Sequence, residues 1–157
     1  HIGSFANVKA IIGALASCDV DKTGTIRKLR VKGMKGVITE RLVKYDSQTR
    51  TQIYSIIDKR NNIVPFVNYT ATIKVKPATA RSCTITWSSR FEPKKGETAA
   101  SCREFVLGIY DLGIGGVKQR LGLTKPKQKA AAKKKAPAKA KPKAKATAKK
   151  KARAKKK

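Results

Sequence analysis

Apolar and polar residues alternate with period two through most of the middle of the chain. This alternation is typical of half-buried strands, and short turn-forming segments separate the alternating runs. Because strands joined in sequence by short turns pair side by side, we expect an antiparallel meander. One face of the sheet should be covered and the other solvated. The predicted strands are residues 24–31, 37–45, 51–58, 67–77 and 82–93.

The segment after the last strand changes to helical spacing. In the segment 98–122, apolar residues recur at Phe105, Ile109 and Leu112, which predicts one long amphipathic helix over residues 98–121. Thr98 is a suitable N-cap and Gly122 a suitable terminator. The helix should supply the cover for the apolar face of the sheet.

The segment before the first predicted strand is also rich in apolar residues. Residues 2–16 mix small and apolar side chains and predict one or two short helices.

The long helix contains four glycines, each of which costs about 1 kcal/mol relative to Ala in a helix interior. Either the helix frays there or its backbone lies close to another segment. The four are Gly108, Gly113, Gly115 and Gly116.

The strand at residues 37–45 carries a carboxylate on its apolar face. Alternation places Glu40 between Ile38 and Leu42. Burial of an unpaired carboxylate is costly, so such a group usually has a partner, a proton or wet surroundings. Two interpretations follow: Glu40 faces a wet pocket between sheet and helix, or it is a structural acid paired with a neighbouring Lys or Arg.

Composition divides the chain into two parts. The net charge is +29, and residues 123–157 contain sixteen Lys, one Arg and no acid, whereas the other 122 residues carry a net +12. Three cysteines form no CxxC pair, which favours reduced thiols in the cytoplasm. No apolar run is long enough to span a membrane. The chain begins at His1 with helix-like sequence, and we interpret it as a fragment or processed chain.

Several short motifs, in this order, resemble the START-like (SRPBCC) superfamily, in particular its polyketide cyclase/dehydrase and lipid-transport branch. They are IGSF, GTIRKLRV, GVITERLVKYD, IYSII, NYTATIKV and TITWSSRFEP, within residues 2–121. The resemblance implies an α+β, helix-grip fold, in which an antiparallel sheet wraps around a long C-terminal helix with a hydrophobic cavity between them. The family's first strand has no counterpart, which is consistent with a lost N-terminus.

The resemblance also implies a ligand site. The plant abscisic-acid receptors share the ERL motif, and their Glu holds polar groups of the ligand through water; the matching position is Glu40. The loop with Gly33 and Met34 occupies the place of the receptors' mobile gate. Lys35 replaces the gate's Pro and the receptors' His-Arg latch has no match, so hormone signalling is not implied. The resemblance implies a pocket lined by Phe5, Glu40, Tyr54, Ile56, Tyr69, Trp87, Phe105 and Ile109.

These observations predict a ligand-binding domain at residues 1–122 that takes a small hydrophobic molecule and needs no cofactor. A cyclase/dehydrase-type enzyme is the alternative, with Glu40 as the only candidate for proton transfer, since no second carboxylate or His accompanies it. No motif typical of a metal site occurs. A third interpretation makes the globular part a scaffold for a nucleoid protein.

Residues 123–157 form a tail of Lys, Ala and Pro that resembles the tails of linker histones and bacterial histone-like proteins. This composition cannot form a core and predicts disorder. We expect sequence-independent binding of DNA or RNA through phosphates, with an anionic membrane surface as the competing partner. Nucleoid association in the cytoplasm would follow. The candidate residues are Lys133, Lys134, Lys135, Lys149, Lys150, Lys151, Arg153, Lys155, Lys156 and Lys157.

Overall fold

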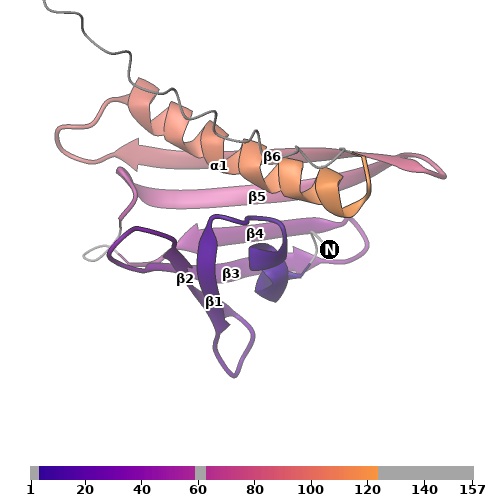
Figure 1. Cartoon of the computed structure of the whole chain (residues 1–157), viewed down its shortest axis with the longest axis horizontal. Helices are drawn as coiled ribbons and strands as arrows, with labels where there is room; N and C mark the ends of the chain where they lie inside the picture. The colour runs from indigo at the N-terminus through magenta and orange to yellow at the C-terminus, as the bar shows by residue number, and fades with distance from the viewer. Residues whose placement is uncertain (1–3, 59–62, 124–157) are drawn as a thin grey trace, which may run out of the picture. The chain divides into compact units, whose positions relative to one another are not determined.

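A six-stranded antiparallel sheet and one long helix make up most of the computed structural model, which describes residues 4–58 and 63–123. The strands pair in chain order, from β1 at one edge to β6 at the other (Figure 1). They are β1 (Leu15–Val20), β2 (Ile26–Val31), β3 (Ile38–Asp46), β4 (Thr51–Ile56), β5 (Phe66–Thr79) and β6 (Ser82–Pro93). A short 3-10 helix, η1 (Phe5–Ala10), precedes them and the helix α1 (Ala99–Arg120) follows.

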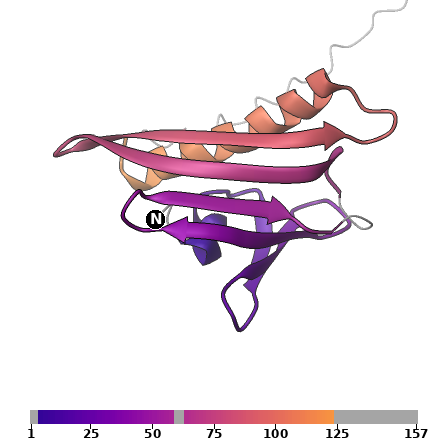
Figure 2. The same cartoon turned by 180° about the vertical axis from the view of Figure 1, so that it is seen from behind.

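Helix α1 lies across one face of the sheet, along β5 and β6, as both views show (Figures 1 and 2). Its buried side chains, which include Cys102, Val106 and Tyr110, point toward that face. The predicted α+β helix-grip fold, the five strands between residues 24 and 93, and the long helix are confirmed.

Strand β1 was not predicted, because residues 2–16 were expected to be helical. Only the first part is helical, as η1, and the chain then pairs with β2 through Cys18 opposite Leu29. A register shift between Leu15 and Ser17 interrupts the alternation of faces. Small residues and this irregularity together remove the period-two signal, so the partner strand is what defines β1.

A bulge at the start of β5 interrupts the alternation of faces. The register shifts between Val67 and Thr70, and Asn68 adopts a left-handed φ of 53°. The bulge turns both Phe66 and Tyr69 into the core, where they are 2% and 6% exposed. Strict alternation would place Val67 on the same face as Tyr69, but Val67 is only half-buried.

Both ends of α1 have the predicted caps. The Thr98 hydroxyl accepts from the Ser101 backbone N–H at 3.1 Å, and the Ser101 hydroxyl accepts from the Thr98 N–H, which completes a capping box. At the other end Gly122 has a φ of 69°. The Leu123 N–H donates to the Lys118 carbonyl at 2.8 Å, as in a Schellman motif.

Two of the four helix glycines lie where the helix backbone approaches another segment. A Cβ at Gly116 would lie 1.8 Å from the Ile11 carbonyl oxygen, and a Cβ at Gly113 would lie 2.4 Å from the Trp87 ring. Gly108 and Gly115 have nothing within 4 Å of that position. Close approach therefore explains two of the four glycines, and it locks the C-terminal half of α1 against the η1–β1 segment and β6.

The described residues belong to one compact unit, residues 1–126. The tail predicted at 123–157 lies outside the described residues from position 124 onward. Among the described residues, no helix is long and apolar enough to cross a membrane.

Candidate functional site

A cavity of about 210 Å³ lies between the sheet and the N-terminal half of α1. Most of its wall is apolar, and the two charged side chains among its described lining residues are Arg27 and Glu40. Small-molecule sites commonly measure about 300–1,000 Å³, so this cavity is smaller than most and a molecule that fills it has to be small. Its wall is formed by Val8, Ile12, Ala14, Leu15, Arg27, Leu29, Val31, Met34, Ile38, Glu40, Tyr54, Ile56, Ile63, Val64, Phe66, Tyr69, Trp87, Phe105, Val106, Ile109 and Leu112.

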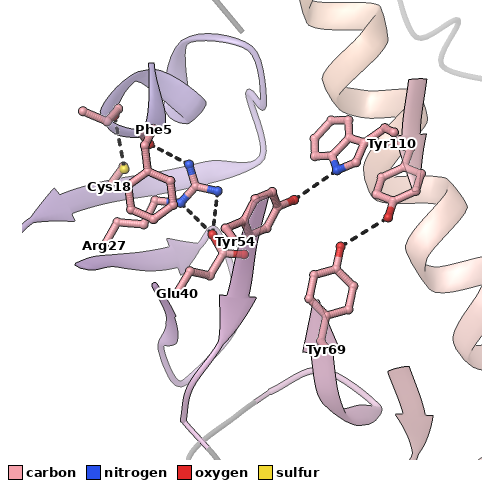
Figure 3. Close-up of polar contacts among 9 residues, drawn as sticks. Phe5, Cys18, Arg27, Glu40, Tyr54, Tyr69 and Tyr110 are labelled. Atoms are coloured by element: carbon pink, nitrogen blue, oxygen red, sulfur yellow. Dashed lines mark hydrogen bonds and ion pairs between the residues drawn. The ribbon is translucent and has the colours of Figure 1, made fainter. Parts of the chain in front are cut away.

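Arg27 and Glu40 form a buried ion pair on this wall (Figure 3). They face each other on neighbouring strands, because β2 and β3 pair with Arg27 opposite Glu40. The Arg27 Nε and Nη2 each lie 2.6 Å from the same carboxylate oxygen, Oε2. Arg27 Nη1 donates to the Phe5 carbonyl, also at 2.6 Å. The pair is only 3% and 6% exposed.

The other oxygen of Glu40, Oε1, accepts no hydrogen bond from the described residues. No fully buried side-chain nitrogen or oxygen of the described residues lacks a partner, so Oε1 retains some accessible surface. Since Glu40 lines the cavity, Oε1 is the carboxylate oxygen for which no described residue competes with a ligand or water.

Aromatic side chains hold the ion pair and add polar groups to the wall. The Arg27 guanidinium carbon lies 4.1 Å from the centre of the Phe5 ring and 5.0 Å from that of Tyr54. The Trp87 indole donates to the Tyr54 hydroxyl at 3.1 Å. The hydroxyls of Tyr69 and Tyr110 are 3.4 Å apart (Figure 3). The site therefore presents oriented hydroxyl dipoles to an otherwise apolar space.

Burial controls the protonation of the site. Burial raises the pKa of the Glu40 carboxyl, and the charge and hydrogen bonds of Arg27 oppose that rise. Burial also raises the pKa of the Tyr54 and Tyr69 hydroxyls, so both stay neutral hydrogen-bonding groups. On β1, the Cys18 thiol donates to the Ala6 carbonyl at 3.3 Å, and burial is the main cause that raises the pKa of this thiol.

The structure brings most of the predicted pocket residues to one cavity. Seven of the eight line it, as does Met34 of the predicted gate loop. Phe5 lies behind Arg27 and off the wall, and Gly33, with a φ of 77°, shapes the turn next to Met34. The seven are Glu40, Tyr54, Ile56, Tyr69, Trp87, Phe105 and Ile109. That these residues contact a ligand stays a prediction.

Arg27 is the important residue that the sequence reasoning missed. The signal was present, because alternation in the 24–31 strand places Arg27 on the same face as Leu29 and Val31. Two charges of opposite sign on the apolar faces of successive strands indicate a buried pair. The two interpretations of Glu40 thus coincide: the residue lines the cavity and is paired with an arginine.

The described residues offer no metal site and no disulfide. In residues 4–58 and 63–123, no cluster of three His, Cys, Asp or Glu is placed to bind a metal ion. Cys18, Cys83 and Cys102 are free thiols. The predicted nucleic-acid residues between Lys133 and Lys157 lie outside the described part of the chain.

A long helix packed against an antiparallel sheet, with an apolar cavity between them, is the helix-grip architecture. The chain belongs to the polyketide cyclase / dehydrase and lipid transport family, whose model matches residues 1–122. No curated protein matches the sequence.

Solved structures share the fold. An uncharacterized protein from Bacillus thuringiensis is 27% identical, with 76% of this chain and 84% of that chain covered and a TM-score of 0.67. The protein XoxI from Bacillus cereus is also 27% identical, with 76% and 81% covered and a TM-score of 0.68. Norcoclaurine synthase from Thalictrum flavum, solved in complex with dopamine and hydroxybenzaldehyde, is 18% identical, with 79% and 78% covered and a TM-score of 0.59. At that identity the likeness concerns the fold alone.

Proposed function

We propose that residues 1–122 bind a small hydrophobic molecule that carries one polar group, inside the cavity between the sheet and α1. The observation that carries this proposal is the combination of an apolar wall with one buried, oriented ion pair. An apolar body would replace water against the aliphatic and aromatic wall. A hydroxyl on the ligand would donate to Oε1 of Glu40, directly or through water.

Binding is better supported than catalysis. General acid–base chemistry on the ligand would need a second titratable group placed with Glu40. Among the described lining residues, the other titratable groups are Arg27, which stays protonated and is held by Glu40 and Phe5, and the Tyr54 and Tyr69 hydroxyls, whose pKa is raised by burial. A cyclase/dehydrase-type reaction, with Glu40 as proton acceptor, is the alternative function that family membership supports.

Tryptophan fluorescence offers a direct test, because the chain has one Trp and Trp87 lines the cavity. Native mass spectrometry of the full chain from its own cells would identify a co-purified compound, which is then titrated into ligand-free protein. We expect Glu40→Gln to weaken binding of a hydroxyl-bearing compound about tenfold, the usual effect of losing a hydrogen bond to a charged group. The matched control is Glu104→Gln, on the exposed face of α1.

The outcomes separate the functions. A compound recovered unchanged after long incubation supports binding, whereas its conversion supports the enzyme. Equal affinity of the wild type and both variants would remove Glu40 from the site. Absence of any co-purified compound and of any fluorescence change with small amphipathic compounds would contradict the proposal.

We also propose that residues 123–157 bind nucleic acid through phosphates. Support comes from seventeen positive charges without one acid. Affinity for duplex DNA should fall with salt, with a log–log slope of about −0.9 per phosphate neutralised. The test is a salt titration of the full chain and of residues 1–122 on two unrelated sequences. Retained binding by residues 1–122, a strong preference for one sequence, or binding only to anionic vesicles would each contradict the proposal.

A further inference from the structure

A second hollow of about 400 Å³ lies at the other end of α1, where the helix terminates. It shares no lining residue with the cavity described above. We call it the C-terminal groove. Its lining comes from the β3–β4 hairpin, from β5 and β6, and from the C-terminal end of the helix. These residues are Tyr45, Ser47, Arg50, Thr51, Gln52, Ile73, Val75, Cys83, Ile85, Val117, Arg120 and Leu121.

The C-terminal groove combines an apolar floor with a positive rim. Ile73, Val75 and Ile85 come from the inward faces of β5 and β6, and the floor continues onto the helix with Val117. No Asp or Glu is among the described residues that line it, whereas two arginines are. A floor of this kind binds hydrocarbon, and two guanidinium groups without an acid attract an anion.

Arg50 is held at the rim by a strained backbone. Its φ is 49°, in the left-handed region that Gly or Asn usually occupies. The turn before it is fixed by Asp46, whose Oδ1 accepts the Gln48 and Thr49 N–H groups at 3.0 Å each. The Arg50 carbonyl accepts the Val75 N–H at 3.1 Å. Residues kept in such a conformation cluster at binding sites, where the strain places a side chain.

Arg120 reaches the same rim from the helix. Its Nη1 donates to the Ala10 carbonyl at 3.2 Å, which orients the guanidinium without neutralising it. Within the described part of the chain, no carboxylate lies within ion-pairing distance of Arg50 or Arg120. The helix C-terminus opposes an anion with only about half an elementary charge, against two full charges on the arginines.

We propose that the C-terminal groove is a binding site for a small amphipathic anion, with a carboxylate or phosphate head between Arg50 and Arg120 and an apolar body on the floor. Guanidinium groups match both heads by paired N–H donors. The volume falls within the range of about 300–1,000 Å³ typical of small-molecule sites. This site goes beyond the function proposed for the cavity and does not depend on it.

The test is a titration of the full chain with decanoate, decyl phosphate and decanol, followed by amide chemical shifts in NMR spectra. We expect decanoate or decyl phosphate to shift the amides of Val75, Ile85 and Val117, and decanol to bind more weakly. The double variant Arg50→Asn/Arg120→Gln should weaken binding of the anion by at least about tenfold.

The matched control is Arg41→Asn/Arg90→Gln, which removes two exposed arginines from the other face of the sheet and should leave affinity unchanged. Arg50→Asn alone serves if the double variant does not fold, since Asn tolerates a left-handed backbone. A response to decanoate but not decyl phosphate, or the reverse, identifies the head group. Shifts confined to the cavity residues, equal binding of decanol, or unchanged affinity in the groove variants would overturn the proposal.

Discussion

Replacing Arg27 with Met should destabilise the fold far more than losing an exposed arginine. The substitution keeps much of the apolar volume but leaves the Glu40 carboxylate buried without its partner. Breaking a buried pair in this way costs about 3–5 kcal/mol. A domain of this size has a total stability of about 5–15 kcal/mol. The loss is therefore a large fraction of the whole.

Urea unfolding at neutral pH measures this loss. With a slope of about 2 kcal/mol/M, the midpoint of Arg27→Met should fall by about 2 M. Arg41→Met is the matched control, because Arg41 is the next residue to Glu40 on β3 and its side chain is exposed. We expect that variant to change stability by less than about 0.5 kcal/mol.

The pH dependence separates charge from packing. Burial raises the folded-state pKa of Glu40 above its ordinary value of 4.5, and without Arg27 the rise is larger. A carboxyl whose pKa is higher in the folded state than in the unfolded state stabilises the fold at a pH below its ordinary pKa. This stability is lost as the pH rises through the folded-state pKa. The cost of Arg27→Met should therefore shrink as the sample is acidified toward that range.

A double variant gives the sharpest check. Arg27→Met/Glu40→Met removes both charges, and replacement of a buried pair by apolar residues is often neutral or stabilising. It should be more stable than Arg27→Met alone. Equal stability of Arg27→Met and Arg41→Met would show that the buried pair is not the source of this stability. So would a cost of Arg27→Met that is independent of pH, together with a double variant no more stable than Arg27→Met.

Two further predictions concern the helix and a turn. In the same urea assay, Gly116→Ala should destabilise the protein by about 1–3 kcal/mol, since its Cβ would overlap the Ile11 carbonyl. Gly115→Ala should be neutral or stabilising by about 0.5–1 kcal/mol. Equal effects of the two substitutions would contradict the close approach of the helix to Ile11. Hydrogen bonds from Thr49 and Gln48 lower the pKa of Asp46, so the stability it contributes is present above its ordinary value of 3.8 and is lost as the pH falls below that value. Asp46→Asn should weaken this acid-induced loss in unfolding curves taken across that range, and parallel wild-type and variant profiles would exclude the turn as its source.

The sequence by itself determined the elements whose signals are local. Period-two alternation located five strands, and helical spacing with Thr98 and Gly122 at its ends bounded α1. The position of the Glu40 carboxylate on the apolar face was also predicted, because the face of a strand residue follows from alternation with its sequence neighbours. Short-range geometry is enough for such features.

Tertiary structure decided the features that depend on what lies across space. The partner of Glu40 is thirteen residues away on β2, and only the β2–β3 register places Arg27 opposite it. Gly116 is explained by the Ile11 carbonyl, a contact between segments more than one hundred residues apart. Arg120 likewise lines the C-terminal groove together with residues of the sheet only because the end of the helix packs against the sheet. Period and propensity set which way each side chain points, but the pairing of strands and the docking of the helix choose the group that it meets.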